Sequence, residues 1–227
     1  MALQHSPSIV TSGLIMCLDA ANPRSYPGSG AAWNDVSGTG INGTLVNGPV
    51  YSSSNGGTIV FDGVDESVTI PSGTLTDGAT LELWFKMTSD KSVELLKYGT
   101  ATVDTPGSHA IYYTPGTLRC LNFITGTRTF VSIVHSITLG DSTWRHMVLS
   151  YLGNNSGGTA SLYINGQLIT SSSATSSNAS FGGSGFSYSA ASYAFPGSAP
   201  VLKMYNRALS TGEVTQNFNA LRGRYGV

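Results

Sequence analysis

The sequence predicts an all-β protein built as a two-sheet antiparallel sandwich with one short C-terminal helix. Strand-sized apolar runs recur along the whole chain, separated by segments rich in Gly, Asn, Asp, Ser and Pro, which is the pattern of a sandwich. The composition agrees, because 28 Gly, 32 Ser and 24 Thr stand among 227 residues and these residues favour strands and loops over helices. Helical periodicity is convincing in only one stretch, close to the C-terminus.

The length and charge narrow the class of protein. A chain of 227 residues fits one sandwich domain, and we expect an N-terminal arm over 1–12 and a single domain over 13–227. The net charge is −1, and scattered basic residues give no footprint for nucleic acid or an anionic membrane. The longest apolar run, 14–18, is too short to cross a bilayer and lacks signal-peptide flanks. We therefore expect no nucleic-acid partner, no membrane insertion and no secretory signal.

The predicted strands follow one another along the chain. In the first half they cover 13–19, 44–50 around a turn at Asn47-Gly48-Pro49, 58–62, 67–71, 79–88 and 93–98. In the second half they cover 109–114, 117–124, 127–138, 144–151, 159–164, 167–171 and 201–205. Residues 171–192 have low complexity and weak strand patterning, so we predict a long surface loop or an irregular edge there.

Alternation is clearest over 80–87, where two faces separate. One face, predicted to be buried, holds Leu81, Leu83, Phe85 and Met87. The other face, predicted to be partly polar, holds Thr80, Glu82, Trp84 and Lys86. Trp84 could line the concave face of the sheet or sit between the sheets, and core packing is the usual role of a Trp on a central strand.

Short sequence motifs predict one turn and one helix, and the surroundings of the two cysteines indicate whether they are free or bonded. Asn165-Gly166 between two apolar runs predicts a two-residue hairpin turn. Ser210 and Glu213 have the spacing of a capping box, and the apolar positions that follow predict a helix ending near Gly223. Cys17 and Cys120 lie in apolar segments, so two buried free thiols are expected rather than a disulfide.

The order of motifs then points to a family. Segments 61–66, 81–86, 144–148, 162–166, 195–197 and 203–210 follow one another in the sequence. In this order the chain resembles the laminin-G-like branch of the concanavalin A-like lectin and glucanase superfamily, from Gly13 to Tyr225. The resemblance implies a jelly roll with Trp144 and Tyr163 on neighbouring strands of the core. It also implies a turn over 205–207 that leads into the last helix.

A narrower resemblance concerns both ends of the chain. Segments 13–19, 26–30, 33–35 and 216–226 are similar to those of lectin-like virion proteins of tailed bacteriophages. This similarity implies a surface protein of the virion, either decorating the capsid or associated with the tail. Its partners would be other virion proteins, copies of itself and host-surface glycans, and it would reach the virion from the host cytoplasm.

No arrangement of residues predicts catalysis. A retaining glucan hydrolase needs two carboxylates about 5 to 5.5 Å apart, yet Glu82 stands alone on its strand. The histidines His5, His109, His135 and His146 belong to no nucleophile motif, and Gly-x-Ser-x-Gly is absent. We expect a non-enzymatic protein in which His146 is a structural hydrogen-bonding residue of a half-buried sheet.

Two kinds of binding site are predicted. Calcium is the cofactor that the resemblance suggests, with oxygen ligands from Asp19, Asp62, Asp65 and Glu66, although 198–201 lacks the carboxylate that the family pattern places there. The alternative is that the turn over 62–66 is a solvated hairpin. A glycan site could use the loop aromatics Tyr26, Trp33, Phe186, Tyr188 and Tyr193, and their alternative role is packing or subunit contact.

Taken together, these observations predict a non-enzymatic virion surface protein that could bind host-surface or environmental glycans. The alternatives are a free calcium-dependent lectin and, less favoured, a glucan hydrolase.

Overall fold

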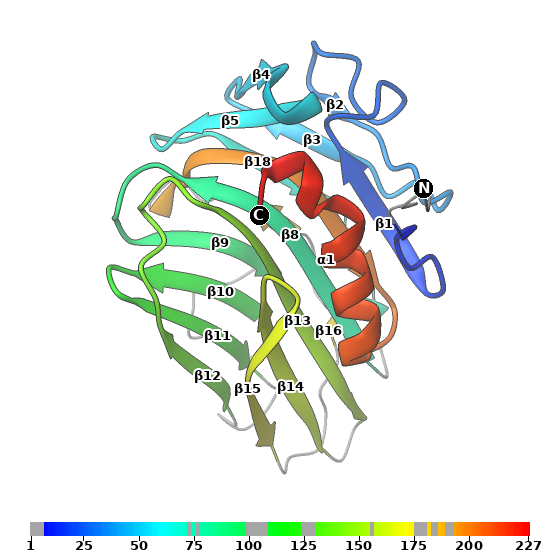
Figure 1. Ribbon diagram of the computed structural model, residues 1–227, viewed down its shortest axis with the longest axis vertical. Coiled ribbons are helices and arrows are strands. Elements are labelled where there is room, and N and C mark those ends of the chain that lie inside the picture. Colours follow the sequence, from blue (N-terminus) through cyan, green and yellow to red (C-terminus); the bar gives the residue numbers. More distant parts are fainter. Residues whose placement is uncertain are drawn as a thin grey trace, which may run out of the picture.

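A computed structural model of the chain describes residues 7–71, 74–75, 78–98, 109–123, 130–154, 157–174, 181–182, 186–188 and 193–227. Two antiparallel sheets pack face to face, and one helix crosses the outer face of one of them (Figure 1). The predicted all-β sandwich with a C-terminal helix is confirmed. No helix among the described residues is long and apolar enough to span a bilayer.

Sheet A has eight described strands, and its central strand is β8. From edge to edge it runs β15 (Gln167–Ala174), β14 (Gly157–Ile164), β13 (Trp144–Asn154), β8 (Gly78–Met87), β18 (Pro196–Tyr205), β5 (Thr58–Asp62) and β4 (Val50–Ser52), with β1 (Leu14–Asp19) also paired to β18. β18 therefore has β8 along one side and β5 followed by β1 along the other.

Sheet B, the second layer, also has eight described strands. It runs β12 (Phe130–Ser136), β11 (Thr117–Phe123), β10 (His109–Thr114), β9 (Val93–Tyr98), β17 (Phe186–Tyr188), β6 (Ser67–Ile70), β3 (Gly43–Val46) and β2 (Ala32–Trp33). A separate pair is formed by β7 (Thr74–Leu75) and β16 (Phe181–Gly182), and a single 3₁₀ turn, η1, covers Ser54–Gly56.

The structure differs from the sequence-based expectation at two places. The run predicted over 44–50 is two strands in different sheets, because the chain crosses from β3 in sheet B to β4 in sheet A at the Asn47-Gly48 turn. The segment 171–192 is not an edge throughout, since β17 pairs with both β9 and β6 inside sheet B. The two strands that pair with β17 are far from it in the sequence. The residue pattern of 171–192 is weak and gives no sign of such pairing.

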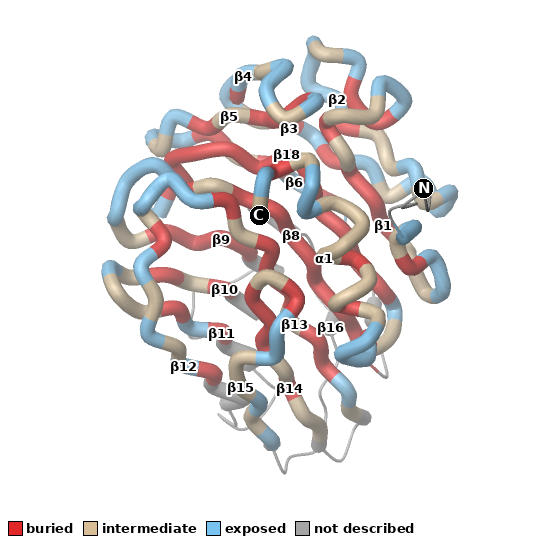
Figure 2. The backbone as a smooth tube through the Cα atoms, in the orientation of Figure 1, coloured by how far each residue is buried: buried red, intermediate tan, exposed pale blue. Residues whose placement is uncertain are grey.

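The second face of β8 is partly polar, as predicted, since it carries Thr80 and Glu82, but it is buried as well. Leu81, Leu83 and Phe85 point into the core between the sheets, as expected. The opposite face of β8 and the whole length of β18 are also buried (Figure 2). This second burial arises because the C-terminal helix lies across sheet A.

The helix α1 (Thr211–Tyr225) is attached by aromatic packing. Trp84 stacks against Phe218 with ring centroids 5.8 Å apart and against Tyr225 at 4.4 Å. Trp144 and Tyr163 lie on neighbouring strands, as the resemblance implies. They pack on this outer face, however, and not in the core between the sheets.

The predicted helix cap and hairpin turn are both confirmed. Ser210 and Glu213 form a capping box at the start of α1. The helix ends later than predicted, at Tyr225, and Gly226 supplies the left-handed C-terminal residue with φ of 71°. At the hairpin, Asn165 and Gly166 have φ of 50° and 76°, as a turn with two positive φ values requires.

Candidate functional site

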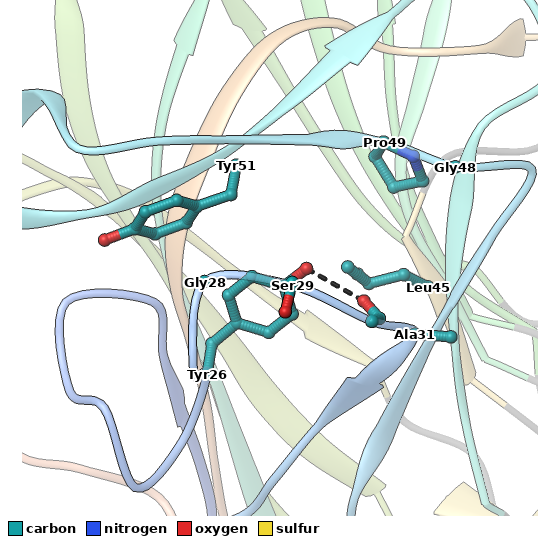
Figure 3. Close-up of a pocket in the computed structure, with 9 residues that line it drawn as sticks. Tyr26, Gly28, Ser29, Ala31, Leu45, Gly48, Pro49 and Tyr51 are labelled. Atoms are coloured by element: carbon teal, nitrogen blue, oxygen red, sulfur yellow. Dashed lines mark hydrogen bonds between the residues drawn. The ribbon is translucent and has the colours of Figure 1, made fainter.

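A pocket of about 420 Å³ lies where an edge of sheet A meets an edge of sheet B (Figure 3). It is formed by the loop between β1 and β2, by β3, and by the turn into β4. The described lining residues are Tyr26, Gly28, Ser29, Gly30, Ala31, Leu45, Gly48, Pro49 and Tyr51. Its volume falls in the range of roughly 300–1,000 Å³ that small-molecule sites occupy.

Two tyrosine rings form part of the pocket wall. The ring centroids of Tyr26 and Tyr51 are 5.6 Å apart, with 40° between the ring planes. Tyr26 is 4% exposed, and its hydroxyl donates a hydrogen bond of 2.8 Å to the Gly30 carbonyl. Burial raises the pKa of this hydroxyl. The ring of Tyr26 is therefore held in place and stays uncharged at neutral pH.

The backbone around the tyrosines depends on turn chemistry. Asn47 and Gly48 both have positive φ, 62° and 80°, and the Asn47 side chain donates a 3.0 Å hydrogen bond to the Asp65 carbonyl. Gly28 has φ of 93°, and a Cβ placed there would be 3.7 Å from carbons of the Tyr51 ring. The loop backbone therefore lies close to Tyr51, in a conformation that glycine adopts without strain.

The structure separates the five aromatic residues predicted for a glycan site. Tyr26 and Trp33 are both buried and belong to the core between the sheets, but of the two only Tyr26 also lines the pocket. Phe186 and Tyr188 lie on β17, and their side chains are outside the described part of the structure. Tyr193 is 41% exposed, and its ring is 5.3 Å from that of Tyr112 on β10.

Tyr26 and Tyr193 consequently belong to different regions. The pocket uses β3, and Tyr193 packs on β10, which lies four strand positions away in sheet B, or about 19 Å at the usual strand spacing. The sequence-based prediction missed Tyr51, because the predicted strand ended at residue 50. The signal that could have found it is an aromatic residue directly after the turn at Gly48-Pro49.

The carboxylates predicted for calcium are also spread out. Asp19 receives two hydrogen bonds of 3.1 Å from Arg224, while Asp62 lies at the end of β5. On β18 these two aspartates pair with positions 201 and 196, so roughly 16 Å of strand separates them. Among described residues, no group of three or more His, Cys, Asp or Glu could hold a metal ion.

The turn after β5 holds the other three predicted ligands. Glu66 accepts a 2.6 Å hydrogen bond from the Asp62 amide. Burial raises the pKa of Glu66, and the charges of Asp62 and Asp65 add to the effect. The four carboxylates predicted as ligands therefore do not come together in one calcium site.

A polar cluster that the sequence analysis did not identify lies beneath α1. Glu82 is its centre, with Lys203 Nζ 2.7 Å from Oε1, His146 Nε2 3.1 Å from the same oxygen, and Asn217 Nδ2 2.6 Å from Oε2. All four residues are buried. The cluster joins β8, β13, β18 and α1, and every member is hidden from solvent.

The pKa shifts of Glu82 and His146 show which groups of this cluster are charged. Burial by itself would raise the pKa of Glu82, but the Lys203 ammonium and the hydrogen bond with His146 outweigh burial and bring the pKa to about 2. Burial lowers the pKa of His146, although Glu82 opposes this shift. The cluster therefore holds one carboxylate, one ammonium and a neutral imidazole at pH 7. This supports the structural role predicted for His146.

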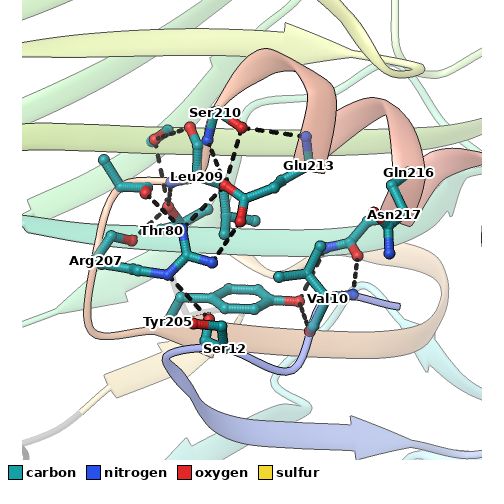
Figure 4. Close-up of polar contacts among 12 residues, drawn as sticks. Val10, Ser12, Thr80, Tyr205, Arg207, Leu209, Ser210, Glu213, Gln216 and Asn217 are labelled. Atoms are coloured by element: carbon teal, nitrogen blue, oxygen red, sulfur yellow. Dashed lines mark hydrogen bonds and ion pairs between the residues drawn. The ribbon is translucent and has the colours of Figure 1, made fainter. Parts of the chain in front are cut away.

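Asn217, one member of this cluster, also holds the N-terminal segment together with residues next to the cluster (Figure 4). Asn217 Oδ1 accepts a 2.7 Å hydrogen bond from the Val10 amide, and the Tyr205 hydroxyl donates a 3.0 Å hydrogen bond to the Val10 carbonyl. Gln216 and Arg207 bond the carbonyls of Ser8 and Ser12. Residues 8–12 of the predicted arm are therefore fixed on the domain by α1 and β18.

Comparison with solved structures identifies similar folds. The binding domain of Paraclostridial Mosquitocidal Protein 1 matches with a TM-score of 0.68 at 16% identity, over 92% of this chain and 52% of that chain. The binding domain of Botulinum Neurotoxin DC in complex with SialylT matches with a TM-score of 0.70 at 12% identity, over 93% and 52%. This chain spans about half the length of these structures, and such low identity shows a shared fold alone.

The sequence comparisons give the family. A search of curated protein sequences finds no match to this chain. A family model of laminin G type, described as the concanavalin A-like lectin/glucanases superfamily, matches residues 62–215. The match covers more than half of the chain and includes β8, β13, β14 and β18 of sheet A. The chain therefore belongs to the laminin G-like branch of the concanavalin A-like lectin/glucanases superfamily.

Proposed function

We propose that this chain is a non-enzymatic, lectin-like domain that binds glycans in the pocket beside Tyr26 and Tyr51. The observation that carries the proposal is the fixed pair of tyrosine rings in a pocket of about 420 Å³. Aromatic rings pack against the apolar faces of sugars, and nearby polar groups then orient the ligand. The fold relatives include binding domains of toxins, one of them in complex with SialylT, which agrees with a binding role.

The positions of the strand carboxylates argue against a glucan hydrolase. The side chain of Glu82 is 0% exposed and pairs with Lys203, so it cannot reach a substrate. Glu94, on β9, is 4% exposed. A retaining mechanism needs two accessible carboxyl groups about 5 to 5.5 Å apart, and neither of these residues meets the requirement for access.

We further propose that the domain belongs to the surface of a tailed-bacteriophage virion, with other virion proteins and copies of itself as partners. The support for this is the similarity of segments 13–19, 26–30, 33–35 and 216–226 to lectin-like virion proteins. Glycan binding by such a protein would hold the particle at a host or environmental surface.

A glycan array with the purified chain tests the binding function. We expect saturable binding to at least one class of glycan by the native protein, and loss of that binding in Tyr51→Ala. Tyr193→Ala, which changes an aromatic residue outside the pocket, is the control and should bind normally. Equal binding by the Tyr51→Ala variant would overturn the assignment of the pocket.

The mass in solution, measured by light scattering with and without calcium, tests the virion proposal. A defined oligomer that calcium does not change is the expected result, since virion surface proteins assemble with their own copies. A monomer whose mass or melting temperature responds to calcium would contradict it and indicate a free calcium-dependent lectin.

A further inference from the structure

We infer that the pocket selects an uncharged saccharide unit and excludes acidic sugars such as sialic or uronic acids. This inference rests on the proposed glycan-binding function and adds the chemical class of the ligand. It begins from the lining of the pocket, since none of the nine described residues around it has a charged side chain.

The apolar part of the lining suits one face of a pyranose ring. Tyr26 is held in place by its own hydrogen bond to Gly30, and Tyr51 is half-buried on β4. Leu45 and Pro49 are buried and line the same pocket. A sugar ring has C–H groups on its faces, which pack well on aromatic and aliphatic surfaces of this kind.

The polar part of the lining consists of neutral groups. Ser29 is exposed and contributes a hydroxyl, which can donate and accept hydrogen bonds. Gly28, Gly30 and Gly48 bring peptide groups to the pocket without side chains. A Cβ placed at Gly30 or Gly48 would meet no atom within 4 Å, so the backbone at these points is open. The hydroxyl groups of a sugar suit these peptide groups, because each sugar hydroxyl can donate a hydrogen bond to a carbonyl and accept one from an amide.

The same lining is unfavourable for an acidic sugar. A carboxylate that enters a partly apolar site loses hydration, and the loss must be balanced by a cation or by several strong donors. The described pocket offers no lysine, arginine or histidine for this purpose. The preference for neutral ligands is therefore an electrostatic consequence of the lining.

The test uses matched glycan pairs that differ only by a terminal sialic acid. We expect native protein to bind the neutral member about tenfold or more tightly than the acidic member, since an unpaired charge costs over about 1.4 kcal/mol. Ser29→Arg, at an exposed position, should reverse or abolish this preference by supplying a cation. Ser29→Gln is the matched control, because it adds similar bulk without charge and should keep the neutral preference.

The outcomes separate the two proposals. Equal or stronger binding of the sialylated members, with Tyr51→Ala still abolishing it, overturns the neutral-sugar inference and leaves the glycan-binding function intact. Failure of the native protein to bind any member of the pairs or of a broad array overturns the glycan-binding function, and the inference with it. Retained neutral preference in Ser29→Arg also contradicts the inference, because the selectivity would then not arise from charge at this pocket.

Discussion

Asn217 connects three parts of the chain that are far apart in sequence. Its side chain bonds the Val10 amide, the Glu82 carboxylate and the Tyr205 hydroxyl, and it is 0% exposed. A buried amide is stable only when its donors and acceptor are paired. This one residue on α1 thus fixes the helix to sheet A and to the N-terminal segment together.

Replacing Asn217 should therefore destabilise the whole domain. We expect Asn217→Ala to lower the free energy of unfolding by about 3 kcal/mol, because it leaves buried groups of Val10 and Glu82 without a partner. Gln216→Ala is the control. That side chain makes an exposed hydrogen bond to the Ser8 carbonyl, and its loss should cost less than about 1 kcal/mol. Urea denaturation of both variants measures the difference, and equal losses would contradict the role of Asn217.

The buried His146 predicts a pH dependence of stability. Burial lowers its pKa from the ordinary value of 6.5, so below about pH 6.5 the unfolded chain takes up a proton that the folded chain does not. The free energy of unfolding must then fall as the pH falls. For Glu82, the pKa is about 2 in the folded chain against 4.5 ordinarily, so its contribution is lost between about pH 4.5 and 2.

Denaturation curves from pH 8 to 5 test this dependence. His146→Gln removes the titrating group, and its stability should change less over this range than that of the native protein. His135→Gln, at a half-buried position on β12, is the control and should keep the native slope. A native slope in His146→Gln would show that another group causes the loss.

At this scale the sequence identifies residues but not their partners. Alternation over 80–87 correctly places Glu82 opposite the core side chains. It cannot show that Lys203 and Asn217, 121 and 135 positions away, approach the same carboxylate. Such partners are set by strand order and by where the helix lies, and neither leaves a local pattern.

Among the elements, the hairpin turn at Asn165-Gly166 and α1 depend on each other. Gly166 lies under the helix, and a Cβ there would be 3.0 Å from Phe218 atoms. Thr215, on the same helix, donates a 3.0 Å hydrogen bond to the Gly166 carbonyl. A glycine at this position meets two needs, since it accepts a positive φ and allows close packing of the helix.

Two glycine substitutions distinguish the cost of a positive φ from the cost of close packing against the helix. Gly166→Ala and Gly116→Ala each place a side chain where φ is positive, 76° and 83°, but a Cβ at Gly116 meets nothing within 4 Å. We expect Gly116→Ala to cost about 1 kcal/mol from backbone strain alone, and Gly166→Ala to cost at least about 1 kcal/mol more from overpacking. Thermal unfolding gives both values, and equal losses would show that Phe218 adjusts freely.

Elements with strong local signals are predictable, and those without them are not. The bounds of β5, β9 and β10 match the predicted runs, since each run is short, apolar and flanked by turn residues. The capping box and the hairpin turn are local chemistry and are equally clear. By contrast, β17 has only three residues, and its place between β9 and β6 is a property of the sheet. The same limit applies to the pocket, because its residues come from separate elements of both sheets.

Across the whole molecule, the N-terminal segment is part of the packed structure. Val10 is 7% exposed and packs with Tyr205 and Val214. The structure therefore gives residues 8–12 a stabilising role.

Two truncations test this stabilising role. Deletion of residues 1–12 should lower the free energy of unfolding by about 3 kcal/mol or more, because Val10 burial is lost and the buried Oδ1 of Asn217 loses its hydrogen-bond donor. Deletion of residues 1–6 retains all described residues of the segment and is the control, for which we expect unchanged stability. Thermal unfolding distinguishes them, and equal stability would show that the segment only lies on the surface.

The pairing of β1 with β18 has a consequence for how the chain folds during synthesis. Among the described strands, β1 is made before all the others, and its strand partner, β18, is made after all the others. β8 likewise pairs with β13 and β18, which are made later. Sheet A therefore cannot close until β18 has emerged, and pairing between such distant segments is slow. Until then β1 should stay exposed on the nascent chain.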